Sequence, residues 1–303
     1  MPNTRDIRRR IKSIQNTKKV TKAMEMVSAS KMKKAVDSVL ASRDYSHLAW
    51  QMIINVSAKT REQLHPLLKE RAKIKKIALV LITSNRGMCG GFNQQVVVKA
   101  LEYIKTAKTQ NAEVGFEFIT VGKKGNAAIL RQGLNITAAF EKSDVVKDIL
   151  EITPLSHLIL DEYLASKYDK VVLFYTDFGS VIKQTARVKQ LLPIQAVEDE
   201  FLGAVQSSEF TTRGIAENFE YKFEPSARLI LNQLLPRLLE VQVYQALLES
   251  NASEHSARMV AMKNASEAAG DMISELTLAY NQIRQMLITK EIAEITGGKA
   301  ALE

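Results

Sequence analysis

Two long segments at the ends of this chain lack the residues that usually interrupt helices. Residues 4–58 contain no glycine or proline, and residues 226–294 contain only Pro236 and Gly270. Because glycine and proline are the least favourable residues in a helix, both segments are predicted to be helical. Each would be several times longer than the usual helix of about 11–12 residues. Helices of that length cannot be buried inside a globular domain, and this constrains the fold strongly.

Apolar or small residues recur along both segments at steps of three and four, as they do along the seam of a coiled coil. The N-terminal series starts with Ile7, Ile11, Ile14, Thr21, Met24 and Ser28, and the C-terminal series runs from Leu229 to Leu287. A helix with one apolar stripe needs a partner. We therefore expect the two segments to pair as an antiparallel coiled coil, with the end of the longer C-terminal helix protruding alone.

The middle of the chain has a different pattern. Between residues 74 and 193, the β-rich runs KIKKIALVLIT, EVGFEFITVG and YDKVVLFYTDF alternate with helical stretches, and SVIKQTARVKQLLPI alternates like an edge strand. This order predicts an α/β fold class, with a central Rossmann-like domain and a mainly parallel sheet. The expected divisions are an N-terminal coiled-coil helix at 1–60, the α/β domain at 74–193, an irregular foot connection at 194–225 and a C-terminal coiled-coil helix at 226–296. Pro236 is expected to bend the last helix and Gly297-Gly298 to end it.

The positive charge is concentrated in the first helix. The chain has a net charge of +9, and residues 1–43 alone hold twelve Lys or Arg against three Asp or Glu. A basic helix indicates an acidic partner, which could be a nucleic acid, an anionic lipid or an acidic protein surface. A nucleic-acid-binding coiled coil is thus one alternative. Against it, aromatic residues make up only 6% of the chain, and no recognised nucleic-acid motif is present.

Two glycine-containing loops follow apolar strands, the usual place of a phosphate-binding turn. SNRGMCGGFN at 84–93 and GKKG at 122–125 match neither G-x-x-x-x-G-K-[ST] nor G-x-G-x-x-G. Tight turns are the favoured interpretation, and a nucleotide-binding enzyme is the alternative. The single cysteine, Cys89, has no catalytic partner pattern, and the four histidines are scattered. We therefore expect no catalytic site, metal or cofactor, and a soluble, cytosol-facing chain without disulfides.

Three stretches resemble the γ subunits of F-type ATP synthases. They are IKSIQNTKKVTKAMEMVSASKMKKA at 11–35, SNRGMCGGFN at 84–93 and the run from VYQALLESNASEHSARMVAMK to ITGG at 243–298. The middle motif is usually S-D-R-G-L-C-G-x-x-N in that family, so Asn85 and Met88 are departures. The resemblance spans nearly the whole chain. It implies a non-catalytic rotor shaft that couples proton flow through a membrane ring to ATP synthesis or hydrolysis in a catalytic hexamer.

The resemblance also implies partners and contact residues. The partners would be the catalytic and non-catalytic nucleotide-binding subunits (β and α), the ε subunit and the membrane proteolipid ring. Met24 would meet the acidic lever loops of the catalytic subunits. Further contacts with the hexamer are implied for Lys18, Lys19, Lys22, Lys31, Lys33, Arg258, Arg284, Gln285, Thr289 and Glu291. The foot segment Tyr221, Lys222, Phe223, Glu224 and Pro225 would reach the proteolipid ring and ε.

Two features favour a bacterial member of the family. The stretch LLPIQAVEDEFLGAVQSSEF at 191–210 has no inserted cysteine pair of the kind found in plant chloroplast versions, and no transit peptide precedes the basic helix. We therefore expect a peripheral protein on the cytoplasmic face of the bacterial inner membrane, held there as part of the ATP synthase.

Overall fold

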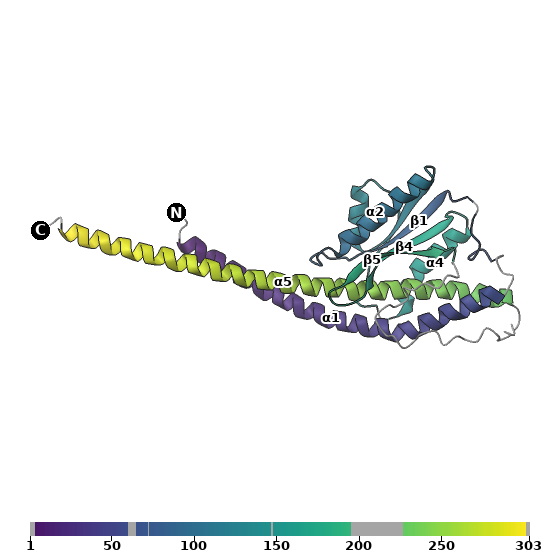
Figure 1. Cartoon of the computed structure of the whole chain (residues 1–303), viewed down its shortest axis with the longest axis horizontal. Helices are drawn as coiled ribbons and strands as arrows, with labels where there is room; N and C mark the ends of the chain where they lie inside the picture. Colours follow the sequence, from purple (N-terminus) through teal and green to yellow (C-terminus); the bar gives the residue numbers. More distant parts are fainter. Residues whose placement is uncertain (1–3, 60–64, 72, 147, 195–226, 301–303) are drawn as a thin grey trace. The chain divides into compact units, whose positions relative to one another are not determined.

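Two long helices begin and end the described part of the chain. The computed structural model describes residues 4–59, 65–71, 73–146, 148–194 and 227–300, without the side chains of 43–47, 49–59, 227–228 and 297–300. Helix α1 runs over Thr4–Lys59 and helix α5 over Ala227–Ala300 (Figure 1). With 56 and 74 residues, they would be about 85 and 110 Å long at 1.5 Å per residue. The prediction of two exceptionally long helices is confirmed.

The predicted end of α5 was wrong. The helix continues through Gly297 and Gly298 to Ala300, because glycine costs only about 1 kcal/mol in a helix and keeps its backbone N–H.

Pro236 also lies inside α5, although it removes one backbone hydrogen bond. The leucines on either side of it, Leu235 and Leu238, are buried. Their packing holds the helix together across the proline.

The residues between the helices form one five-stranded sheet. Its strands are β1 (Lys76–Ile82), β2 (Gly115–Val121), β3 (Ile136–Phe140), β4 (Lys170–Phe178) and β5 (Gln184–Leu192). They lie in the order β3-β2-β1-β4-β5. All neighbouring pairs are parallel except β4 and β5, which are antiparallel. The α/β class and the mainly parallel sheet are confirmed.

The burial of each strand follows from its position. In the central strand β1, every residue after Lys76 is buried, as expected for a parallel strand that is covered on both faces. β5 is an edge strand, as its alternating sequence predicted. The other edge strand, β3, has only five residues and no buried one. The sequence prediction did not include it, because ITAAF lacks a continuous run of large apolar residues.

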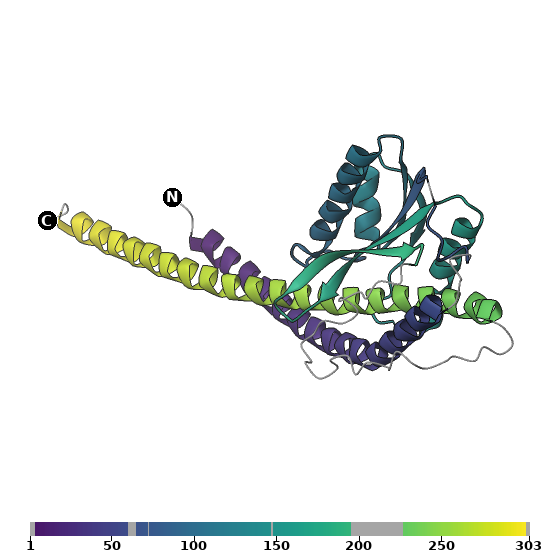
Figure 2. The ribbon, with the colours of Figure 1, turned by 45° about the vertical axis from the view of Figure 1, so that its right-hand side comes forward.

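Helices cover both faces of the sheet. α2 (Phe92–Gln110) and α3 (Lys123–Arg131) pack on one face, in a core that contains Leu79, Val96 and Ile129. On the other face lies α4 (Thr153–Leu164), preceded by a short 3-10 helix at Ile149–Ile152. This second core also includes residues of α1 and α5, among them Ala35 and Leu248. Figure 2 shows the sheet between α2 and the two long helices.

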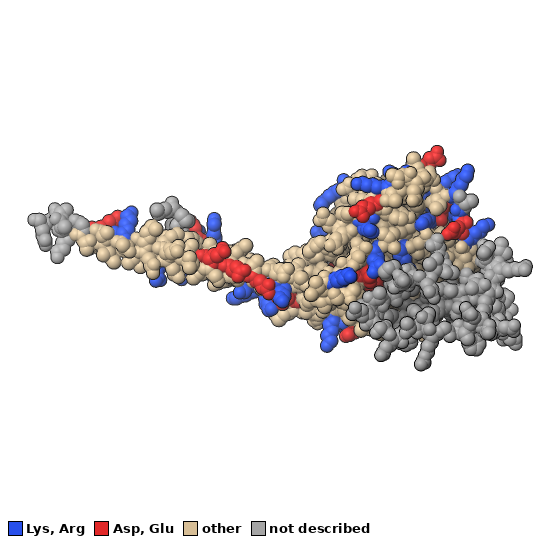
Figure 3. Space-filling model, in the orientation of Figure 1, with Lys and Arg blue, Asp and Glu red and all other residues tan. Residues whose placement is uncertain are grey.

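The chain divides into two compact units. One, called the outer coiled coil below, comprises residues 1–28 and 258–303. The other, called the α/β unit, comprises residues 29–257 and includes the sheet, its helices and the adjoining parts of α1 and α5. Both long helices therefore contribute to both units. Lys and Arg side chains are scattered over the visible face of the α/β unit, whereas a row of acidic side chains follows the outer coiled coil (Figure 3).

Candidate functional site: the outer coiled coil and the glycine loops

The first glycine loop is a tight turn tied together by its own side chains. The Ser84 backbone N–H donates to Asn93 Oδ1 over 2.9 Å, and Asn93 Nδ2 donates to Ser84 Oγ over 2.7 Å. Gly90 and Met88 both have positive φ angles, of 56° and 62°. Cys89 is buried beneath this turn and lies 3.2 Å from Asn93 Nδ2. Hydrogen bonds among the polar groups of the loop thus stabilise its conformation.

The second loop leaves no backbone donors for a phosphate. At the start of α3, the Lys123 N–H donates to Asn85 Oδ1, the Lys124 N–H to the Ser84 carbonyl and the Gly125 N–H to Thr83 Oγ1. A phosphate at a helix N-terminus needs these same first-turn groups. The second loop is therefore explained as a tight connection between β2 and α3, and the first likewise connects β1 to α2.

The histidines and acidic residues do not form a metal centre in the described part of the chain. His65 lies against Asn232, His157 against Glu240 and His255 against a backbone carbonyl. On α4, Asp161 is exposed, and Glu162 pairs with Lys167. These side chains lie at separate places and do not converge on one site.

In the outer coiled coil, α1 and α5 pack through a seam of small and medium-sized residues. Ile7, Thr21, Ser28, Met262 and Ala269 are buried along it. As residue numbers rise along α1 they fall along α5, since Lys18 lies at Gly270 whereas Arg10, Ser13 and Ile14 lie near Met272, Glu275 and Leu276. The predicted antiparallel pairing is present in this unit.

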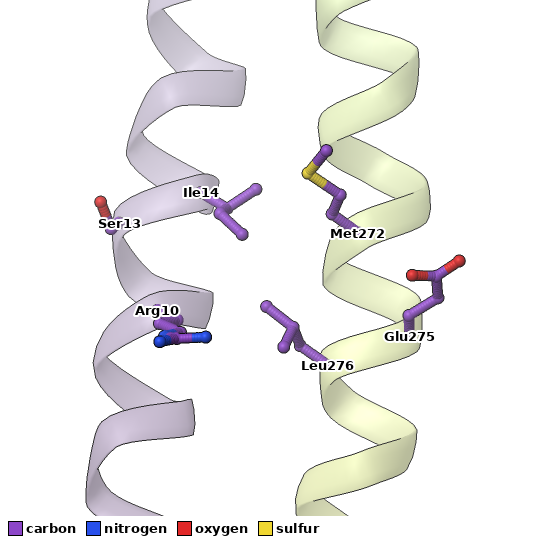
Figure 4. Close-up of a pocket in the computed structure, with 6 residues that line it drawn as sticks. All are labelled: Arg10, Ser13, Ile14, Met272, Glu275 and Leu276. Carbon is purple, nitrogen blue, oxygen red and sulfur yellow. The ribbon is translucent and has the colours of Figure 1, made fainter. Parts of the chain in front are cut away.

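The seam of the outer coiled coil contains a hollow. A shallow hollow of about 320 Å³ lies between Ile14 on α1 and Met272 and Leu276 on α5. Figure 4 shows these three apolar side chains between the helices, whereas Ser13 and Glu275 point away. The two helices alone therefore leave part of their apolar seam accessible.

Gly270 makes room for a predicted contact residue. A Cβ atom at this position would lie 2.9 Å from Lys18 Nζ, so a larger residue would displace the lysine. The ammonium group of Lys18 crosses α5 at this point. The glycine costs about 1 kcal/mol in the middle of a helix and lets the Lys18 side chain lie directly against α5.

The other predicted residues of α1 differ in their surroundings. Met24 is half-buried beside the seam, and Lys19 is exposed. Lys22 is exposed and pairs with Glu25 over 3.0 Å. Lys31 and Lys33 belong to the α/β unit, where Lys33 is exposed and Lys31 forms a 2.6 Å ion pair with Asp144.

The predicted contact residues of α5 also fall into two groups. Arg258 is buried, at 8% exposure, whereas Arg284, Gln285, Thr289 and Glu291 are exposed. Every residue from 284 to 296 is exposed. The free C-terminal end of α5 that the sequence predicted is therefore present. The foot residues Tyr221–Pro225 lie outside the described residues.

A set of apolar side chains in the outer coiled coil is exposed. They are Val20, Met26, Val27, Met272, Leu278, Met286, Leu287, Ile288, Ile292 and Ile295. The sequence pattern placed Leu287 in the seam, and the other nine are apolar residues outside that series. Exposed apolar side chains in such number are typical of an interaction surface.

No helix in the described part of the chain is long and apolar enough to cross a membrane.

Comparisons with known proteins agree with this architecture. Residues 3–302 match a family model described as ATP synthase. The chain is 43% identical to the ATP synthase gamma chain of Pelotomaculum thermopropionicum and 42% identical to that of Dehalococcoides mccartyi, over the full length of each protein. The gamma chain of Nitrosospira multiformis is 39% identical, again over both full lengths.

Solved structures show the same fold. A chain of the central stalk and c-ring structure of the Tetrahymena thermophila mitochondrial ATP synthase aligns with a TM-score of 0.58 and 25% identity, covering 82% of this chain and 99% of that one. A chain of the Euglena gracilis mitochondrial ATP synthase aligns with a TM-score of 0.64 and 17% identity, covering 99% and 94%. The sequence motifs, the long helix pair and the full-length matches lead to one conclusion: this chain belongs to the ATP synthase gamma chain family.

Proposed function

We propose that this chain is the central rotor shaft of a bacterial F-type ATP synthase. The observation that carries the proposal is the end of α5, where residues 284–296 are exposed on every face and yet include Met286, Leu287, Ile288 and Ile292. Such a helix end is suited to a surrounding protein cavity. In this role the outer coiled coil turns inside a hexamer of α and β subunits, which hold the nucleotides and carry out catalysis.

The rest of the chain would connect the shaft to the membrane part of the enzyme. The α/β domain at 74–193, the foot connection at 194–225 and the residues Tyr221–Pro225 would contact ε and the proteolipid ring. Proton flow would turn the ring, and the shaft would carry the rotation to the hexamer. The protein would then be peripheral, on the cytoplasmic face of the inner membrane, and would itself catalyse nothing.

The chemistry of the outer coiled coil suits contacts that must break during rotation. Met24 lies beside the seam, with the exposed cations Lys18, Lys19 and Lys22 on the same helix. Exposed ion pairs with acidic loops contribute only about 0–1 kcal/mol each. Many such contacts can therefore form and separate as the shaft turns.

Binding to a nucleic acid is less consistent with the surface. Glu267, Asp271 and Glu275 are exposed on α5 within the outer coiled coil, and acidic side chains form a row there in Figure 3. A row of carboxylates repels a phosphate backbone and offsets the basic residues of α1.

Reconstitution tests the proposal. We expect the chain to co-purify with α, β and ε subunits, and ATP-driven proton pumping in membrane vesicles to require it. Isothermal titration of the isolated chain with ATP or ADP should show no saturable binding. Pumping at the wild-type rate by a complex without this chain would contradict the proposal.

Removal of residues from Gln285 onward gives a sharper test. Because residues 284–296 make no buried contacts within the chain, this deletion should leave its thermal unfolding temperature unchanged within about 2 °C. The protons pumped per ATP hydrolysed should fall. Unchanged coupling after removal of all of α5 would rule out a shaft.

A further inference from the structure

One stretch of α5, residues 249–256 (ESNASEHS), is buried although seven of its eight residues are polar. All of it lies in the α/β unit. Buried polar side chains need hydrogen-bond partners. Six of the seven polar residues find partners in the sheet and its connecting loops, whereas Glu249 accepts a hydrogen bond from Gln245 on α5 itself.

Four side chains of this stretch bond to backbone carbonyl oxygens of the α/β fold. The bonds are Asn251 Nδ2 to Ser143 (3.2 Å), Ser253 Oγ to Thr176 (3.3 Å), His255 Nε2 to Asp144 (2.9 Å) and Ser256 Oγ to Val181 (2.7 Å). The acceptors lie at the end of β4 and in the loops after β3 and β4. The helix is thus attached at two separate places, to the loop after β3 and to the end of β4 with the loop that follows it.

A buried ion pair lies at the centre of these bonds. Lys142 Nζ is 2.7 Å from Glu254 Oε2, and the two side chains are only 2% and 5% exposed. The ammonium group also lies 3.4 Å from Ser250 Oγ and 5.3 Å from the centre of the Phe92 ring. Lys142 directly follows Glu141 after β3, so the pair joins the sheet to α5.

Helix α1 holds the same loop from another side. Lys31 Nζ pairs with Asp144 Oδ2 over 2.6 Å. This hydrogen bond from Lys31 lowers the pKa of the Asp144 carboxyl below its ordinary value, despite partial burial. Residues 142–144 are therefore bonded to both long helices.

A buried ion pair is a poor source of net stability. Removing two charges from water costs about as much as their attraction returns, so apolar residues of similar size would often serve equally well. Hydrogen bonds differ from apolar contacts in being directional, and they weaken steeply when donor and acceptor lose alignment. An apolar contact would let α5 turn about its own axis against the sheet, whereas these bonds oppose that movement.

We propose that Lys142 and Glu254, together with the serines of the 249–256 stretch, lock the rotation of α5 relative to the α/β domain and so transmit torque between them. This inference rests on the proposed rotor function. Lys142 and Glu254 are positioning residues in it. α5 then carries the torque as one uninterrupted helix from Ala227 to Ala300.

The test measures the torsional stiffness of the rotor in the assembled complex. The hexamer of α and β subunits is fixed to a surface, and a nanorod is attached to the α/β domain through the substitution Lys108→Cys, at an exposed position on helix α2. Cys89 is 1% exposed and will not compete for the probe. Cysteines of the other subunits are replaced. The angular variance of the stalled rotor then reports its compliance.

The first variant is the double substitution Lys142→Met and Glu254→Met, which removes both charges and approximately keeps the volume. Because it removes a strong charge-assisted bond between α5 and the sheet, we expect about a two-fold increase in angular variance. The exposed pair Lys123–Glu141 has the same 2.7 Å separation but is 64% and 75% exposed. Its double methionine variant is the matched control and should have wild-type variance.

A second variant, Ser253→Ala with Ser256→Ala, removes the two bonds to backbone carbonyls and the bond that Ser256 Oγ accepts from Gln184. Alanine also has a higher helix propensity than serine. This variant too should raise the angular variance, while the unfolding temperature of the chain stays near that of wild type. If the methionine variant does not assemble, this serine variant tests the inference in its place. Wild-type variance in the assembled variants, or an equal increase in the Lys123–Glu141 control, would overturn the inference. A wild-type chain that does not rotate in the hexamer would instead contradict the proposed function.

Discussion

Asn85 donates a 2.6 Å hydrogen bond from its side-chain amide to the backbone carbonyl oxygen of Lys142. Its Oδ1 atom also accepts from the backbone N–H groups of Lys123 and Lys142. One side chain thus joins the first glycine loop, the start of α3 and the loop after β3. A carboxylate could accept the two N–H bonds but could not donate the third. This explains what an asparagine adds where related motifs usually have aspartate.

Substitutions at Asn85 should therefore destabilise the fold in a graded way. Asn85→Ala removes three hydrogen bonds and should lower the free energy of unfolding by about 2–3 kcal/mol. Asn85→Asp removes one and should cost about 1 kcal/mol. Urea denaturation of the isolated chain at neutral pH measures both. An alanine variant as stable as the aspartate variant would show that the two accepted bonds contribute nothing.

Gly122 and Gly133 offer a matched pair for the second glycine loop. Both have positive φ angles, of 101° and 68°, but a Cβ at Gly122 would lie 2.3 Å from the Thr83 carbonyl oxygen, and one at Gly133 would meet nothing within 4 Å. Gly133→Ala should cost about 1–2 kcal/mol for backbone strain alone. Gly122→Ala adds a steric clash and should cost about 2–5 kcal/mol. Thermal unfolding of both variants measures this difference in stability. Equal losses of stability would show that a Cβ at position 122 causes no clash.

Much of the fold could be predicted because its signals are local. The absence of glycine and proline marked α1 and α5, and the continuous apolar run IALVLI marked the central strand β1. β3 lacked such a signal, because an edge strand of five residues is stabilised by pairing with β2 rather than by its own sequence. The end of α5 was misplaced because two glycines weaken a helix without breaking it.

The contacts inside the α/β unit could not be predicted in the same way. Lys142 and Glu254 are 112 residues apart in sequence, and a lysine and a glutamate are ordinarily surface residues. Only the topology that brings the loop after β3 against α5 buries them together. Likewise, the sequence does not distinguish Lys31 from the other basic residues of α1, whereas the structure pairs it with Asp144. A lysine that is exposed and a lysine that forms an ion pair within the fold cannot be told apart from their neighbours in the sequence.

Asp169 should make the stability of the chain sensitive to acid. Burial raises the pKa of this carboxyl, but the backbone N–H groups of Lys75 and Lys76 and the Arg71 guanidinium together lower it below its ordinary value of 3.8. A carboxylate with a lowered pKa stabilises the fold above its unfolded pKa, and this contribution is lost as the pH falls through the folded value. We therefore expect the unfolding free energy to fall below about pH 4.

Asp169→Asn isolates this contribution. The variant should be less stable at pH 7, and its stability should fall less steeply than that of wild type between about pH 5 and pH 2. Urea denaturation across this range gives both slopes. Asp161→Asn, at an exposed position on α4, is the control and should follow the wild-type curve. Parallel curves for wild type and Asp169→Asn would exclude a role for Asp169.

Met24 tests the proposed contact between the shaft and acidic loops of the hexamer. Its side chain is half-buried beside the seam of the outer coiled coil, so a lysine there can extend its ammonium group to the surface. Met24→Lys should bind such loops more tightly, resist their release during rotation and lower the protons pumped per ATP hydrolysed. The unfolding temperature of the chain should change by less than about 4 °C. Met24→Leu keeps the apolar volume and should couple normally, and full coupling efficiency in the lysine variant would place Met24 away from those loops.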